Sequence, residues 1–130
     1  MILVDSSAWI EFLRATGSPA HLTVRETLTD GQLAVTEPVI MEVLAGARDD
    51  DHAAQLESLL GLARLVPTLA SDYLDAARVY RRCRQRGETV RRMVDCLIAA
   101  VAIRSGATLL HHDRDFDVIG RHSRLTLYTG

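Results

Sequence analysis

Four acidic residues lie beside or inside segments apolar enough to form a protein core, and this limits what the chain can fold into. They are Asp5 after residues 2–4, Glu42 within 39–44, Asp95 before 96–103, and Asp113 after 108–110. A carboxylate in such a place costs desolvation energy, and several in one pocket raise one another's pKa. A divalent cation that prefers oxygen ligands, such as Mg²⁺ or Mn²⁺, removes both costs. The sequence therefore predicts a metal-dependent hydrolase of phosphate esters.

The spacing of the apolar runs predicts the fold class. Short runs expected to be strands alternate with helical segments, and these runs lie at 2–4, 32–36, 65–67, 107–110 and 125–128. Such alternation predicts an α/β fold with a central, mostly parallel five-stranded sheet covered by helices on both faces. The length suits one compact domain, so residues 1–130 are expected to form a single domain. Ligands bind such sheets beyond the carboxyl ends of the strands, so the four acids are expected to meet at that edge.

Each acid also has a purely structural interpretation. Asp5 could cap the helix that follows it, and Asp95 could cap a helix expected from Cys96, or cap and ligate at once. Glu42 could lie on the polar face of an amphipathic helix, although its immediate neighbours are apolar. Glu42 and Asp95 are both expected near the starts of their helices. The convergence of all four acids, rather than any one of them, favours a functional site.

Further candidates lie near Asp5 and Asp113. Asp115 and Asp117 compete with Asp113 as ligands; Asp113 ranks first, Asp115 is a possible supporting residue, and Asp117 is expected to be structural. Ser7 shares a loop with Asp5. Its hydroxyl could hold a ligand carboxylate or a water, or it could only cap the helix, and these alternatives stay open.

All 15 basic residues are arginine, and the formal net charge is −2. Bulk charge therefore does not predict a polyanion-binding protein, and the coding bias of a GC-rich genome explains most of the absence of lysine. Seven arginines crowd residues 78–92, either as a solvated helix face or as a rim that contacts phosphates. Arg91 and Arg92, just before Asp95, are the best placed, because the arginine fork matches phosphate bidentately.

Other features narrow the class of protein. Cys83 and Cys96 have neither zinc nor redox spacing. No uninterrupted apolar segment reaches about 18 residues, so no membrane partner is expected, and a reducing, cytoplasmic setting follows. A phosphatase or response-regulator-like domain, whose aspartate accepts a phosphoryl group, would need a lysine at its site, or an equivalent. The chain contains no lysine, so the sequence does not favour this class.

Three segments carry a resemblance to a known family. They are MILVDSSAWIEFL at the start, EPVIMEVLAG in the first half, and VDCLIAAVAIRSGATLLHHDRDF near the end. The motifs are D-x-S, a glutamate in an apolar helix, D-x-x-I-A-A and H-x-D-x-D-F. Each motif is short, but the motifs are jointly specific, and the resemblance extends over essentially the whole chain. The sequence resembles PIN domains and, more narrowly, the VapC toxins of bacterial VapBC toxin–antitoxin pairs.

The resemblance implies a fold, an activity and a set of site residues. The fold is an α/β/α sandwich around a mostly parallel sheet, and the activity is endoribonuclease hydrolysis dependent on Mg²⁺ or Mn²⁺. The implied catalytic and metal-binding residues are Asp5, Glu42, Asp95 and Asp113, with Asp115 as an occasional helper. Asp5 and Asp95 are the expected direct ligands, whereas Glu42 and Asp113 act through water or on a second ion.

The resemblance also implies partners. The substrates are structured RNAs, tRNA or rRNA, whose cleavage inhibits translation and growth, and Arg91 and Arg92 become candidate RNA contacts. A VapB-type antitoxin neutralises the toxin by placing a basic side chain in the acidic pocket, and homodimers and toxin–antitoxin hetero-oligomers are expected. The alternative is a non-catalytic PIN module that binds RNA or protein, which the presence of all four acids argues against.

Overall fold

A computed structural model describes residues 1–130 and contains one sheet of five strands. The strands are β1 (Ile2–Val4), β2 (Leu33–Val35), β3 (Arg64–Leu65), β4 (Thr108–Leu110) and β5 (Thr126–Leu127). Their order is β3-β2-β1-β4-β5, and every neighbouring pair is parallel. β1 lies at the centre, where Leu3 is in register with Ala34 of β2 and Leu109 of β4. The predicted parallel sheet is confirmed.

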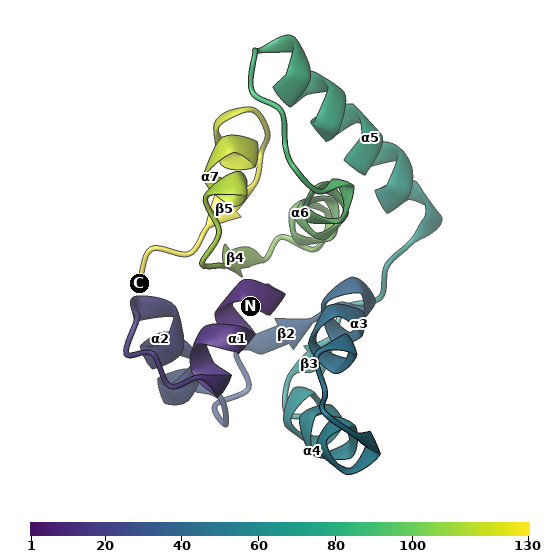
Figure 1. Ribbon diagram of the computed structural model, residues 1–130. Coiled ribbons are helices and arrows are strands. Elements are labelled where there is room, and N and C mark those ends of the chain that lie inside the picture. The colour runs from purple at the N-terminus through teal and green to yellow at the C-terminus, as the bar shows by residue number, and fades with distance from the viewer.

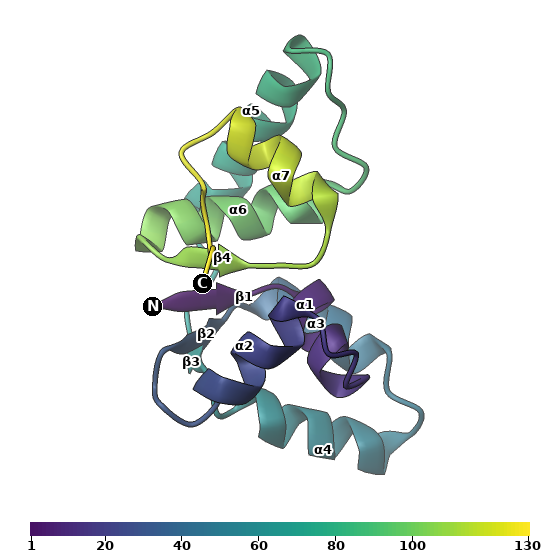
Figure 2. The same ribbon diagram turned by 90° about the vertical axis from the view of Figure 1, so that its left-hand side faces the viewer.

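Seven helices cover the two faces of this sheet (Figure 1). They are α1 (Ser6–Leu13), α2 (Pro19–Thr27), α3 (Glu37–Ala45), α4 (Asp50–Leu60), α5 (Ala70–Gln85), α6 (Met93–Ser105) and α7 (Arg114–Arg121). Figure 2 shows α5, α6 and α7 on one side of the sheet and α1 to α4 on the other. The predicted α/β/α sandwich is confirmed. None of the seven helices combines the length and apolar character needed to cross a bilayer.

One hydrophobic core of 33 buried residues joins the sheet to both helical layers. β1 and β2 are buried along their whole length, as expected for parallel strands covered on both faces. α6 is buried continuously from Asp95 to Ala102. A helix that is apolar on all sides belongs inside a protein, and α6 fills the space between the sheet and α5.

Asp95 lies near the start of its helix, as predicted, whereas Glu42 does not. α6 begins at Met93, so Asp95 lies in the first turn, and the alternative in which Asp95 caps a helix beginning at Cys96 is wrong. Arg92 takes the N-cap position, and the backbone N–H of Asp95 already donates to the carbonyl of Arg92 at 3.1 Å. Glu42 is in the sixth position of α3 rather than near its start. Because Arg92 takes the N-cap position, the side chain of Asp95 does not cap α6.

Candidate functional site

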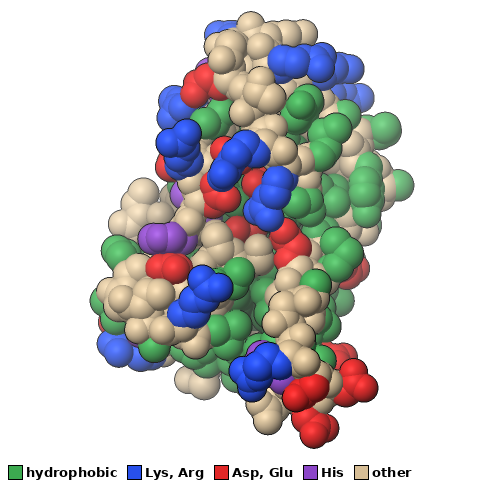
Figure 3. Space-filling model, viewed as in Figure 1, with side chains coloured by type: hydrophobic (Ala, Val, Ile, Leu, Met, Phe, Trp, Pro, Cys, Tyr) green, Lys and Arg blue, Asp and Glu red, His purple; other side chains and the backbone are tan.

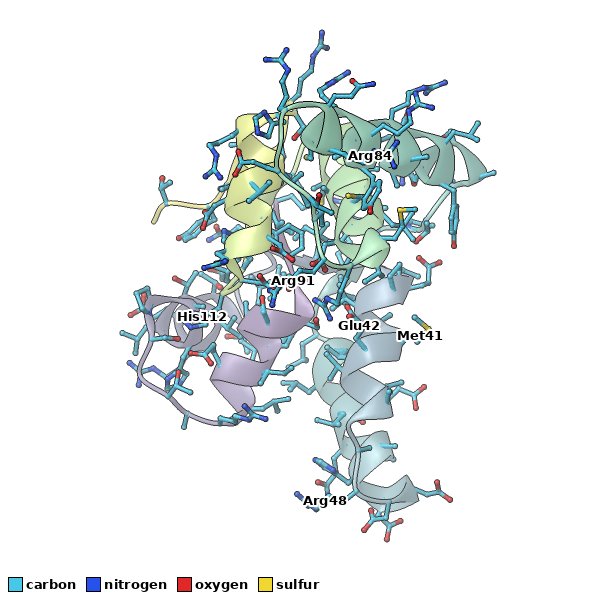
Figure 4. The ribbon with its side chains drawn as sticks, turned by 45° about the horizontal axis from the view of Figure 1, so that its top comes forward. Met41, Glu42, Arg48, Arg84, Arg91 and His112 are labelled. Carbon is cyan, nitrogen blue, oxygen red and sulfur yellow. The ribbon has the colours of Figure 1, made fainter.

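The four predicted acids approach the carboxyl edge of the sheet from four segments. β1 and β4 are adjacent and parallel and stay in register to Val4 and Leu110. The backbone N–H of Asp5 then donates to the carbonyl of Leu110 at 2.9 Å, so the chain segments after both strands leave the sheet together. Asp113 follows β4, Asp95 stands in the first turn of α6, and Glu42 comes from α3. Figure 4 shows Glu42 and Arg91 directed toward the same region between the two helical layers.

Asp5 is fully buried and is both a helix cap and a potential ligand. Its Oδ2 accepts from the Ser7 backbone N–H at 3.0 Å and from the Ser7 hydroxyl at 2.6 Å. Ser7 Oγ in turn accepts from the backbone N–H of His112 at 2.9 Å, which ties α1 to the segment after β4. Oδ1 of Asp5 is buried with no hydrogen-bond partner. Burial raises the pKa of Asp5 above its usual range, against the hydrogen bonds from Ser7.

Asp95 has the most perturbed carboxylate of the site. Its side chain is fully buried, Oδ1 accepts from Nη2 of Arg92 at 3.0 Å, and Oδ2 has no hydrogen-bond partner. Burial is the main cause that raises the pKa of Asp95 to about 7. The neighbouring charge of Arg92 opposes this rise, whereas the carboxylates of Asp5, Asp113 and Glu42 add to it.

Glu42 is held from two sides. Ser6 Oγ donates to Oε1 at 3.1 Å, and Nη1 of Arg92 donates to Oε2 at 3.1 Å. Burial and the nearby charge of Asp5 raise the pKa of Glu42. The consecutive hydroxyls of Ser6 and Ser7 therefore hold two different acids, Glu42 and Asp5.

Asp115 joins the cluster more closely than its sequence rank suggested. One carboxylate oxygen each from Asp95, Asp113 and Asp115 lie within 4.8 Å of one another. Oδ1 of Asp113 accepts from the backbone N–H of Asp115 at 2.9 Å, which also caps α7. Asp115 itself is buried. Its role as a metal ligand remains a prediction.

The residues of this site fit a hard divalent cation. Two buried carboxylate oxygens, Oδ1 of Asp5 and Oδ2 of Asp95, lack any hydrogen-bond partner. A buried acceptor without a partner is costly, and a buried charge more so. The surrounding ligand atoms are all carboxylate or hydroxyl oxygens, the set that Mg²⁺ and Mn²⁺ prefer.

Two arginines contribute contacts that sequence reasoning did not anticipate. Arg92 donates to Glu42 and Asp95, while Arg91 donates to Asp113 at 3.0 Å and to Asp115 at 3.0 Å. Both pair with carboxylates of the site, and their predicted contact with RNA phosphates stays a prediction. Ser6 was not among the predicted site residues. The signal in the sequence was the doubled residue type, Ser-Ser after Asp5 and Arg-Arg before Asp95.

Comparison with known proteins yields both sequence and structural relatives. The PIN domain family matches residues 2–122. The chain is 51% identical over 128 residues to ribonuclease VapC11 of Mycobacterium tuberculosis, covering 96% of both proteins. It is 30% identical over 118 residues to ribonuclease VapC51 of the same species, covering 90% of this chain and 83% of the relative.

Solved structures share the fold at low sequence identity. VapBC2 of Rickettsia felis, bound to a DNA fragment from its promoter, matches with a TM-score of 0.77 and 18% identity over 98% of each chain. The sarcin–ricin loop cleaving toxin VapC20 of M. tuberculosis matches with a TM-score of 0.70 and 20% identity, covering 92% of this chain and 95% of that one. At these identities the likeness concerns the fold alone.

Proposed function

Because this chain belongs to the PIN domain family and, within it, to the VapC ribonucleases, we propose that it is a metal-dependent endoribonuclease toxin of a toxin–antitoxin pair. Residues 1–130 act in this proposal as a single PIN domain. The buried, unpartnered oxygens of Asp5 and Asp95 are the observation that supports metal dependence most directly. Their surroundings match a cation site better than a site for a neutral ligand.

The chain's own residues have distinct roles in this proposal. Asp5 and Asp95 would hold Mg²⁺ or Mn²⁺ directly, and Glu42 and Asp113 would complete the site through water or around a second ion, with Asp115 supporting them. When bound, the ion supplies positive charge that offsets the phosphodiester and lowers the pKa of an attacking water. Ser7 orients Asp5 through its 2.6 Å hydrogen bond, which leaves Oδ1 free.

The proposed substrate is a structured RNA, tRNA or rRNA. The name of the relative that is 51% identical, ribonuclease VapC11, supports RNA as the substrate class. A sarcin–ricin loop cleaving toxin has the same fold. The side chains of Arg91 and Arg92 are 66% and 47% exposed at the rim of the site, which suits contact with the RNA backbone.

The proposed protein partners are a VapB-type antitoxin and a second copy of this chain. Several proteins of the same fold are described as toxin–antitoxin complexes, including VapBC2 of Rickettsia felis and a complex from Klebsiella pneumoniae. A negatively charged pocket at the carboxyl edge would accept a basic side chain from such an antitoxin. The cytoplasm, where RNA substrates are found, is the proposed location.

Cleavage by single-residue variants tests the proposed activity. Asp5→Asn and Asp95→Asn are expected to lower cleavage of a mixed tRNA and rRNA pool by about a thousandfold or more, since each removes a metal ligand worth several kcal/mol. Chelation with EDTA is expected to stop the wild-type reaction. Sequencing the 5′ ends of the products identifies the cut sites.

Asp50→Asn is the matched control, because Asp50 is exposed at the start of α4, a helix that contributes none of the acids of the site. It is expected to cleave as the wild type does. Full cleavage by folded Asp95→Asn protein would contradict the proposed mechanism. RNA binding without any cleavage by the wild type would instead favour a non-catalytic PIN module.

A further inference from the structure

One guanidinium group contacts three of the four acids of the proposed metal site. Arg92 Nη1 lies 3.1 Å from Oε2 of Glu42, and Nη2 lies 3.0 Å from Oδ1 of Asp95. Nη2 is also 3.9 Å from Oδ2 of Asp113. These carboxylates come from α3, α6 and the segment before α7, so one side chain bridges three separate parts of the fold.

The setting of Arg92 differs from that of a structural arginine. Arg104 makes three hydrogen bonds to the single carboxylate of Asp72 and a fourth to the carbonyl of Pro67. Arg92 divides its contacts among different carboxylates, and its side chain is 47% exposed. It stands at the N-cap of α6 without a side-chain capping bond, so leaving the pocket breaks no backbone contact.

Arg92 and a divalent ion would use the same negative charge. Glu42 Oε2 and Asp95 Oδ1 already accept from Arg92, whereas Asp5 Oδ1 and Asp95 Oδ2 accept from nothing. A doubly charged ion placed among these carboxylates would lie within a few ångströms of the guanidinium and repel it. Like charges at such distances repel one another even when water screens them.

From this arrangement we propose that Arg92 is a built-in counter-ion of the acidic pocket, which competes with the divalent metal and is displaced when the metal binds. The inference rests on the proposed function, because it concerns regulation of the same site. Arg92 then has two opposite effects. It stabilises the protein when no metal is bound, by compensating buried carboxylates, and it weakens metal binding.

Calorimetric titration with Mn²⁺ tests the competition directly, without an activity assay. Arg92→Gln is expected to bind Mn²⁺ about tenfold more tightly than the wild type, since one positive charge near the ion is removed. In EDTA the same variant is expected to unfold at a lower temperature, and saturating Mn²⁺ is expected to remove most of that difference. Arg92→Lys keeps the charge but contacts fewer carboxylates, so its affinity for Mn²⁺ is expected to lie between the two.

Arg78→Gln is the charge-matched control, because Arg78 pairs with Asp75 on α5 and touches none of the four acids. It is expected to bind Mn²⁺ as the wild type does. A purely structural role for Arg92 would lower the unfolding temperature without tightening Mn²⁺ binding, and this result would overturn the inference. If Arg92→Gln does not fold, equal affinity of Arg92→Lys and wild type would overturn it in the same way.

The outcome also separates this inference from the proposed function. Wild-type protein that binds and uses Mn²⁺, with no gain in Arg92→Gln, refutes only the role of Arg92. Failure of both wild type and Arg92→Gln to bind Mn²⁺ refutes the metal site itself and the inference with it.

Discussion

Burial and charge conflict most strongly at Asp95. Its side chain is fully buried in α6, and its pKa is raised from the ordinary value of 3.8 to about 7. In the unfolded chain the Asp95 carboxyl has its ordinary pKa and loses its proton at about pH 4. In the folded protein it keeps the proton up to about pH 7. The stability that this group contributes is therefore present at low pH and is lost as the pH rises through that range.

The metal-free stability of Asp95→Asn follows from this direction. Asparagine cannot ionise, so the variant does not lose stability as the pH rises. We therefore expect its free energy of unfolding in EDTA at about pH 8 to exceed that of the wild type by about 1–2 kcal/mol. This gain is smaller than the pKa change alone implies, because burying the polar amide of asparagine also costs desolvation energy. Urea unfolding at about pH 8 and about pH 4 measures the gain, which is expected to disappear at the lower pH. A variant less stable than wild type at pH 8 would contradict the raised pKa.

The affinity for metal is expected to rise with pH as Asp95 ionises, whereas the metal-free stability falls. A carboxylate must lose its proton before it ligates a metal, so protons compete with Mn²⁺ at Asp95. We expect the affinity of the wild type for Mn²⁺ to fall by about tenfold per pH unit below the pKa of about 7 and to level off above it. Calorimetric titrations at several pH values measure this, and an affinity independent of pH between 5.5 and 8 would exclude Asp95 as the titrating ligand.

At the scale of single elements, α6 carries both the site and the core. Its first turn presents Asp95 to the site, and the residues from Cys96 to Ala102 are buried behind it. The helix ends at Gly106, which has a left-handed backbone with φ +70° and lets the chain turn directly into β4. The end of α6 at Gly106 therefore helps to position β4, and Asp113 after it, relative to the first turn of α6.

Substitution of two glycines at helix ends tests this element. Gly106→Ala is expected to lower the free energy of unfolding by about 1 kcal/mol, because a Cβ disfavours the left-handed conformation. Gly46→Ala is the matched control, since Gly46 ends α3 in a right-handed conformation and its Cβ would meet only the Val43 carbonyl at 3.5 Å. It is expected to be neutral or slightly stabilising. Equal losses in the two variants, measured by urea unfolding, would show that backbone conformation is not the cause.

At the scale of the whole molecule, charge is segregated although the total is only −2. Residues 78–92 hold seven arginines and one acid, Glu88, whereas three aspartates stand together at the start of α4. Figure 3 shows basic side chains gathered over the half of the molecule that holds α5 and α7, and acidic ones at the opposite tip. The acidic site lies between these regions. RNA approaching the site would thus meet a surface of favourable charge on one side only.

A polar cavity of about 250 Å³ is part of this basic surface. It is lined by Arg82, Arg86, Arg121, His122 and Ser123, with no apolar residue. If RNA phosphates bind here, Arg82→Gln with Arg86→Gln is expected to reduce the salt dependence of RNA binding, the slope of log affinity against log salt, by about two.

The binding is measured in the Asp5→Asn background, so that cleavage does not interfere. Arg25→Gln with Arg48→Gln is the control of equal charge, because these residues belong to α2 and to the segment after α3, and Figure 2 shows both helices on the side of the sheet opposite to α5. An unchanged slope in the Arg82 and Arg86 variant would place the RNA elsewhere.

The sequence by itself determined the fold class and which acidic residues lie toward one edge of the sheet. The alternation of apolar runs with helical segments specifies a parallel sheet with two helical layers, because burial on both faces requires continuous apolar strands. Asp5 and Asp113 could be placed at one edge because they follow strands that must end together in such a sheet. These are local patterns, and local patterns are readable without coordinates.

Only the tertiary structure decided which side chains pair within the site. The bond from Ser6 to Glu42 spans 36 positions in the chain, and that from Arg92 to Glu42 spans 50. Such pairs depend on ångström distances between elements, which hydrophobic periodicity does not encode. The same reason explains why the sequence ranked Asp115 only as a possible supporting residue, although it lies in the acidic cluster with Asp95 and Asp113.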